Sequence, residues 1–219
     1  RASKKNFFFW SCVSTTLLVN AVVRTWFLFE PGGSFERAVF PDEANYYVPA
    51  ARLVLELGCS FFLTERSIWT GPLNPLWIAL WNVDLSMIRV ANIFLVSLAG
   101  FFLSFTACRL YDVRAAIATA LLFSLYPLLW KYAGSALTEP LFITLLISFL
   151  GLIVVAEEKQ SCMVYFCSGI VLGAAALARP TIQLFPLFLP AAAVIFSFSK
   201  LAMIDRRSFL KLLLIVVGF

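Results

Sequence analysis

Long blocks of apolar residues separated by short polar turns constrain this chain more than any other feature. Of its 219 residues, 62% are hydrophobic and only 13% are charged. A soluble domain carries about twice that charged fraction, and a helix needs about 20 apolar residues to cross the hydrocarbon core of a membrane. The blocks therefore predict an all-α polytopic membrane protein, with residues 1–219 forming a single membrane module.

The block lengths predict about seven transmembrane helices, the last of them incomplete. The expected spans are Phe7–Phe29, Met87–Cys108, Ala115–Tyr132, Thr138–Ala156, Cys162–Ala178, Thr181–Ser199 and Phe209–Phe219. Another apolar stretch, Pro72–Asn82, is too short to span, so we expect it to be interfacial or re-entrant.

The basic residues cluster at the ends of the expected spans, and this sets the topology. The net charge is +5, but its distribution fits a membrane protein better than a nucleic-acid partner. If the N-terminus with Lys4 and Lys5 is cytoplasmic, the Arg109–Arg114 turn is cytoplasmic as well. The first loop, residues 30–75, then lies on the outer side. We expect a bacterial inner membrane, with the endoplasmic reticulum as the alternative.

The first outer loop carries signals for a helix of its own. Asp42 and Glu43 precede Ala44–Leu57, and Gly58 follows; acidic residues in a first turn and a glycine just past the last turn mark helix boundaries. Apolar residues near helical spacing (Tyr47, Val48, Ala51 and Leu55) predict an amphipathic helix on the membrane surface. With Pro72–Asn82, the loop would carry two juxtamembrane helices.

The residue inventory restricts the chemistry. The chain has no histidine, which excludes histidine-based triads and histidine-ligated zinc. Its five cysteines form no CxxC site and suggest no disulfide framework. The remaining candidates for functional residues are the carboxylates and cations near the outer ends of the expected spans.

Asp42 and Glu43 are the first such candidates. They are either an ordinary acidic helix start or catalytic carboxylates, acting as a general base or facing a metal at the membrane surface. Glu139, at the start of a span, either complements the helix dipole or acts as a second catalytic acid, since ionisable groups at membrane depth are usually functional.

The candidate cations lie on the same expected side. Arg179, in the turn Ala178-Arg179-Pro180-Thr181, is either an ordinary interfacial arginine or a phosphate ligand. Lys131 is either a second ligand of the same phosphate or a lysine whose charged end extends to the membrane interface.

In their order, these segments resemble the N-terminal membrane module of the glycosyltransferase C superfamily. The similarity is to dolichyl-phosphate-mannose protein mannosyltransferases and to bacterial transferases that add aminoarabinose or other sugars to lipopolysaccharide. The segments that carry it are Pro41-Asp42-Glu43-Ala44-Asn45-Tyr46-Tyr47, Met87-Ile88-Arg89-Val90-Ala91-Asn92, Leu137-Thr138-Glu139-Pro140-Leu141 and Ala178-Arg179-Pro180-Thr181.

The resemblance implies a polyprenyl-phosphate sugar as donor, and a lipid, glycan or protein as acceptor. Asp42 would be the base, Glu139 the second acidic site and Arg179 the ligand of the donor phosphate, with a divalent metal as an option. Relatives often place a basic residue or histidine before the short apolar run, where this chain reads Thr70-Gly71-Pro72-Leu73; Arg66 is the candidate substitute. The further helices and soluble domain of such proteins are missing, so we expect a fragment that could be inactive by itself.

Two other readings stay open. A transporter or flippase-like protein would use Glu139, Arg24 and Arg179 along a substrate path, although transporters usually show internal repeats and none is evident here. A non-catalytic scaffold with the same fold is the other.

Overall fold

The computed structural model describes residues 13–14, 18, 21–22, 40–183, 211 and 214–219. Every regular element in these residues is helical, and they contain no strand. The predicted all-α fold class is therefore confirmed for the described part of the chain.

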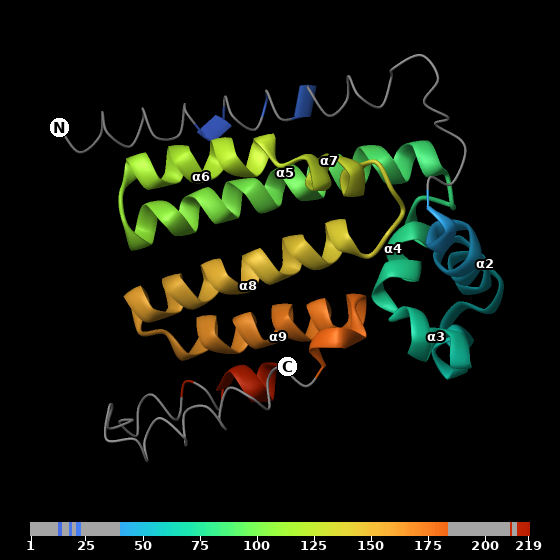
Figure 1. Ribbon diagram of the computed structural model, residues 1–219. Helices are drawn as coiled ribbons and strands as arrows, with labels where there is room; N and C mark the ends of the chain where they lie inside the picture. Colours follow the sequence, from blue (N-terminus) through green and yellow to red (C-terminus); the bar gives the residue numbers. More distant parts are fainter. Residues whose placement is uncertain (1–12, 15–17, 19–20, 23–39, 184–210, 212–213) are drawn as a thin grey trace.

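The longer helices run side by side and alternate in direction, and the short helix α7 continues from the end of α6 (Figure 1). These five helices are α5 (Leu85–Leu110), α6 (Val113–Leu125), α7 (Pro127–Ala133), α8 (Glu139–Lys159) and α9 (Cys162–Ala178). Helix α8 packs between α5 and α9, and α6 packs on α5. The start of α8 and the end of α9 therefore lie at the same end of this bundle.

Several of these helices can cross a membrane. Three described stretches are long and apolar enough: Glu43–Leu63, Leu85–Leu110 and Glu139–Lys159. The pair α6–α7 would be a fourth, and α9 is apolar but has only 17 residues. The structure thus supports membrane-spanning helices, whereas the number seven stays a prediction, because the expected spans Phe7–Phe29 and Thr181–Ser199 lie almost entirely outside the described residues.

The expected span Ala115–Tyr132 is broken into two helices. Helices α6 and α7 meet at an angle of 59°, and Tyr126 between them is extended, with φ −72° and ψ 111°. Pro127 explains the break, because proline lacks an N–H and disfavours helical backbone in the residue before it.

A cap of short helices gathers at the end of the bundle where α8 begins (Figure 1). It contains a π-helical turn η1 (Glu43–Tyr47), α2 (Val48–Leu57), a 3-10 segment η2 (Gly58–Leu63), α3 (Glu65–Thr70) and α4 (Leu73–Leu80). Although Glu43–Leu63 is long enough to span, α2 packs against α4 and lies at the end of the bundle, not alongside its helices.

A helical run does lie between Asp42 and Gly58, but its buried face differs from the expected one, and its place on the membrane surface stays a prediction. The helical run starts after Asp42 and stops at Gly58, whose φ is +56°. Ala50, Ala51 and Val54 are buried with Tyr47 packed against them, whereas Leu55 is exposed. The cause is the contact with α4. The residues that face α4 follow Tyr47 at intervals of three and four residues, and these are the ones that are buried.

Helix α4 matches the short helix expected within Pro72–Asn82. It packs against both α2 and α9, and the preceding Gly71 makes the closest approach. Gly71 has φ +68°, and a Cβ there would lie 2.7 Å from the carbonyl oxygen of Leu177 and 3.0 Å from that of Ala178. This glycine lets the α3–α4 connection rest directly on the end of α9, one residue before Arg179.

The opposite end of the bundle carries its own ion pairs. Arg109 contacts Glu158 at 2.6 Å, and Lys211 contacts Glu157 at 2.8 Å. The basic turn that we expect on the cytoplasmic side therefore lies at the end away from the cap.

Candidate functional site

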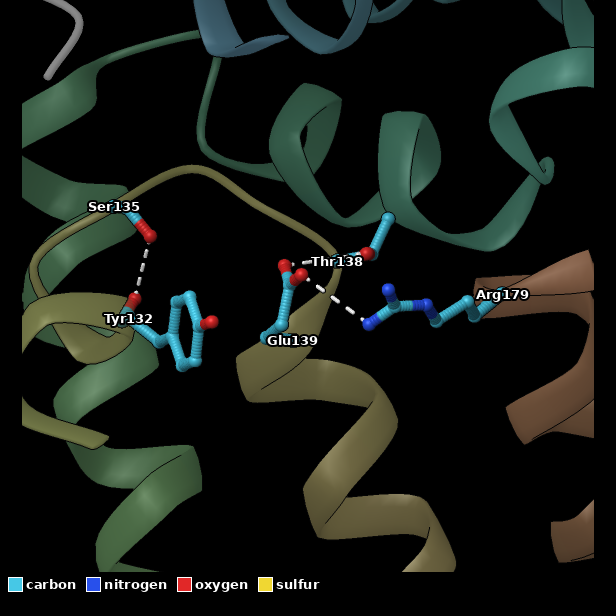
Figure 2. Close-up of polar contacts among 5 residues, drawn as sticks. All are labelled: Tyr132, Ser135, Thr138, Glu139 and Arg179. Carbon is cyan, nitrogen blue, oxygen red and sulfur yellow. Dashed lines mark hydrogen bonds and ion pairs between the residues drawn. The ribbon is translucent and has the colours of Figure 1, made fainter. Parts of the chain in front are cut away.

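An ion pair joins two of the predicted site residues at the capped end. The Nη1 of Arg179 donates to Oε1 of Glu139 at 3.2 Å, and Figure 2 shows the two side chains pointing toward each other from α9 and α8. Glu139 lies in the first turn of α8 and Arg179 just after the last turn of α9. Both charges are therefore favoured by the helix dipoles.

This ion pair stays accessible from outside. The Arg179 side chain is 40% exposed and that of Glu139 is 19% exposed, so a ligand can reach the guanidinium. Arg179 also lies over the ring of Phe142, at 5.8 Å from its centroid. A guanidinium with free edges and one carboxylate partner can accept a second anion such as a phosphate.

One hydroxyl group contacts the carboxylate of Glu139, and a second lies nearby. Thr138 Oγ1 donates to Glu139 Oε2 at 3.4 Å. Figure 2 shows the Tyr132 ring beside Glu139, on the side away from Arg179, with the carbonyl of Tyr132 accepting from Ser135 Oγ at 2.7 Å. The site is thus a carboxylate and a guanidinium among neutral donors.

Tyr47 connects the ion pair to the cap. Its phenol interacts electrostatically with Asp42, Glu139 and Arg179. Asp42 itself is exposed and precedes η1. The predicted base therefore lies at the same end of the bundle as Glu139 and Arg179 (Figure 1).

Glu43 has a different environment from its neighbour Asp42. Its side chain is fully buried, Oε2 accepts from the backbone N–H of Phe40 at 3.1 Å, and Oε1 accepts from the backbone N–H of Ala136. The buried Arg89 of α5 adds an electrostatic interaction with Glu43. Glu43 thereby ties the start of the cap to the connection that leads into α8.

A second polar link holds the same connection from the other side. Asn92 of α5 donates from Nδ2 to the Ser135 carbonyl at 2.6 Å and accepts from Trp77 Nε1 of α4 at 3.0 Å. Asn92 is 1% exposed, so these bonds form in a low-dielectric environment. They fix α4 and the start of α8 relative to α5.

The remaining two predicted cations contact the flank of the cap. Arg66 donates from Nη2 to the Asn45 carbonyl at 3.1 Å, and Lys131 Nζ lies 4.8 Å from the centre of the Phe40 ring. Both lie beside the residues around η1. Their predicted contact with a donor phosphate remains a prediction.

Sequence reasoning assigned no functional role to Tyr47 or Asn92. Tyr47 follows Glu43 by four residues, which places the two on one helical face, and that spacing could have suggested a shared site. For Asn92 the signal was a polar residue inside an expected span, where a polar side chain needs a partner.

Comparison with models of protein families, with curated proteins and with solved structures gives no match to this chain. The resemblance to the glycosyltransferase C superfamily therefore remains a prediction. Among the described residues, no three cysteine, aspartate or glutamate side chains group as metal ligands. A divalent metal likewise stays untested.

Proposed function

We propose that this chain is a membrane glycosyltransferase that moves a sugar from a polyprenyl-phosphate donor to an acceptor at the capped, outer end of the bundle. One observation carries the proposal: Glu139 and Arg179 form an ion pair 3.2 Å long at the end of the bundle that carries the cap, and Asp42 lies at the start of that cap (Figure 1). A cation and a carboxylate thus meet at the end of helices that are long enough to span a membrane.

In this proposal the reaction is a direct displacement at the anomeric carbon. Asp42 takes the proton of the acceptor hydroxyl or amine while the acceptor atom bonds to the anomeric carbon. The bond from that carbon to the phosphate oxygen breaks, and the polyprenyl phosphate leaves with the electron pair. Arg179 stabilises the charge of the departing phosphate, and Glu139 holds the guanidinium in place.

The two adjacent acids have different proposed roles. Asp42 is exposed and can meet an acceptor, whereas Glu43 is buried and accepts two backbone N–H groups. We therefore assign the proton transfer to Asp42 and treat Glu43 as a positioning residue.

A transfer assay in lipid vesicles tests this function. The purified chain is incubated with a panel of polyprenyl-phosphate sugars, and release of polyprenyl phosphate is measured. Asp42→Asn should abolish release while the chain still inserts and folds, whereas Glu56→Gln, a matched exposed acid of the same loop, should retain it. Full transfer in Asp42→Asn would remove Asp42 from the mechanism.

The break between α6 and α7 favours a transporter or flippase-like protein as the second candidate. Discontinuous helices in transporters form substrate sites at membrane depth, and this pair bends by 59°. A transporter would move solute or lipid across proteoliposomes without consuming a lipid-linked sugar. Flux of this kind, together with no transfer from any donor in the panel, would favour this candidate.

A further inference from the structure

The segment η2–α3 exposes four large apolar side chains, while Phe61 and two of the segment's hydroxyl side chains are buried and Glu65 is exposed. Ser67 and Thr70 are buried, while Leu63 is 91% exposed, Trp69 82% and Ile68 72%. Phe62 is exposed as well. A surface turn in water would have the opposite distribution, and contiguous exposed apolar patches mark interaction sites.

The buried hydroxyls pair with carbonyl groups of the segment itself. Thr64 Oγ1 donates to the Phe61 carbonyl at 2.7 Å, and Thr70 Oγ1 donates to the Arg66 carbonyl at 2.8 Å. Ser67 Oγ is shared between the carbonyls of Phe62 and Thr64, at 3.1 and 2.8 Å. Short helices leave such carbonyls without backbone partners, and in lipid these groups must be satisfied within the protein.

The segment is also attached to the end of the membrane-spanning bundle. Trp69 and Thr70 directly precede Gly71, which touches the carbonyls of Leu177 and Ala178. Leu177 of α9 is itself 49% exposed. The apolar surface of α3 therefore lies next to the apolar surface of α9, at the level of Arg179, and Figure 1 shows α3 at this end of the bundle.

We infer that Phe62, Leu63, Ile68 and Trp69 form a lipid anchor that inserts into the boundary between headgroups and acyl chains on the outer side. Tryptophan prefers that boundary. The hydrogen bonds favour a lipid bilayer as the partner of this surface. The segment satisfies its own carbonyl groups, and the four large side chains that it exposes are apolar. The anchor holds the α3–α4 connection, and with it the end of α9, at headgroup depth. The inference does not depend on transferase activity.

Spin labels on the full chain in phosphatidylcholine–phosphatidylglycerol nanodiscs test the anchor. In a background with all five cysteines changed to serine, Leu63→Cys and Trp69→Cys carry the label. Phe94→Cys, on the exposed side of α5, is the lipid reference, and Glu56→Cys is the water reference. The measured quantity is collision with oxygen relative to collision with a water-soluble nickel complex.

The labels at 63 and 69 should exceed the label at 56 several-fold in this ratio and stay below the label at 94, which lies about nine residues further into the membrane. A ratio at 63 and 69 equal to that at 56 would overturn the anchor. Spectral broadening between labels that disappears on dilution with unlabelled chain would also overturn it, because a second copy of the chain would then cover the surface. If the cysteine-free background does not fold, quenching by brominated lipids in the native chain replaces the labels. Trp69→Phe should then lower the quenched fraction of tryptophan emission, and an unchanged fraction would overturn the anchor.

Discussion

Arg179 Nη1 lies 3.2 Å from Glu139 Oε1, although the two residues are 40 positions apart in the chain. The contact joins the turn after α9 to the first turn of α8. An ion pair this exposed adds at most about 1 kcal/mol to stability. Its importance therefore lies in holding a guanidinium at a defined place beside Tyr47 and Thr138.

Arg179→Ala should weaken donor use far more than it weakens the fold. Charge-assisted contacts to phosphate are about twice as strong as neutral hydrogen bonds, so we expect KM for a polyprenyl-phosphate sugar to rise by about 10-fold or more. Arg179→Lys should recover only part of the affinity, because lysine cannot bind two oxygens in one plane. Arg52→Ala, which removes an exposed arginine of α2, is the control. An unchanged KM in Arg179→Ala would remove Arg179 from the donor site.

Glu43→Ala should destabilise the fold. The change leaves the N–H groups of Phe40 and Ala136 without their carboxylate acceptor, at about 1–3 kcal/mol for each buried group. Glu43→Gln keeps one carbonyl acceptor and should cost less. The free energy of unfolding in mixed micelles measures both, and the exposed Glu56→Ala should change it by about 0.5 kcal/mol or less. Equal losses for Glu43→Ala and Glu56→Ala would contradict the buried link.

The two glycines with positive φ should respond differently to alanine. Gly58→Ala introduces only an unfavourable backbone conformation, since nothing lies within 4 Å of the new Cβ; this costs about 1–3 kcal/mol. Gly71→Ala adds a Cβ 2.7 Å from the Leu177 carbonyl and must displace backbone as well. We expect a larger loss of stability and, in the transfer assay, a higher KM because Arg179 would shift. Similar effects at both positions would argue against the close contact with α9.

Two neighbouring tryptophans form another matched pair. Trp77 Nε1 donates to Asn92 at 3.0 Å, whereas Trp81 Nε1 is buried and has no hydrogen-bond partner among the described residues. Trp77→Phe should therefore destabilise and should couple to Asn92→Ala by about 0.5–3 kcal/mol in a double-mutant cycle. Trp81→Phe removes an unpaired donor, so its hydrogen-bonding contribution should be neutral or stabilising. Additive effects of Trp77→Phe and Asn92→Ala would show that the link is not formed.

The ends of the bundle should be reached from opposite sides of the membrane. Asn45 lies in the cap, and the exposed Tyr111 lies in the turn between α5 and α6 at the other end. In the cysteine-free background, an impermeant maleimide should label Asn45→Cys from outside and Tyr111→Cys only after the membrane is opened. Labelling of both from one side would contradict the predicted topology.

The helices that the sequence predicts well are those whose limits are set by residues close to them in the chain. Acidic residues before Ala44 and a glycine after Leu57 set the limits of the helical run η1–α2, since they act within one turn. The long apolar blocks likewise predicted α5, α8 and α9 to within a few residues. Three features depend on finer backbone geometry: the π-helical form of Glu43–Tyr47, the separate helix α3 and the break before Pro127. The sequence does contain the proline, but it did not by itself predict the break.

The sequence alone thus gave candidate charges at Asp42, Glu43, Glu139 and Arg179 and the expectation that they share one side of the membrane. Only the tertiary structure decided their partners. It buries Glu43 against the Ala136 N–H, leaves Asp42 exposed, pairs Glu139 with Arg179 and places Tyr47 among these charges. The physical reason is that hydropathy and helix signals depend on neighbours in the chain, whereas these contacts depend on how α8, α9 and the cap pack, with the approach at Gly71 setting where the end of α9 lies.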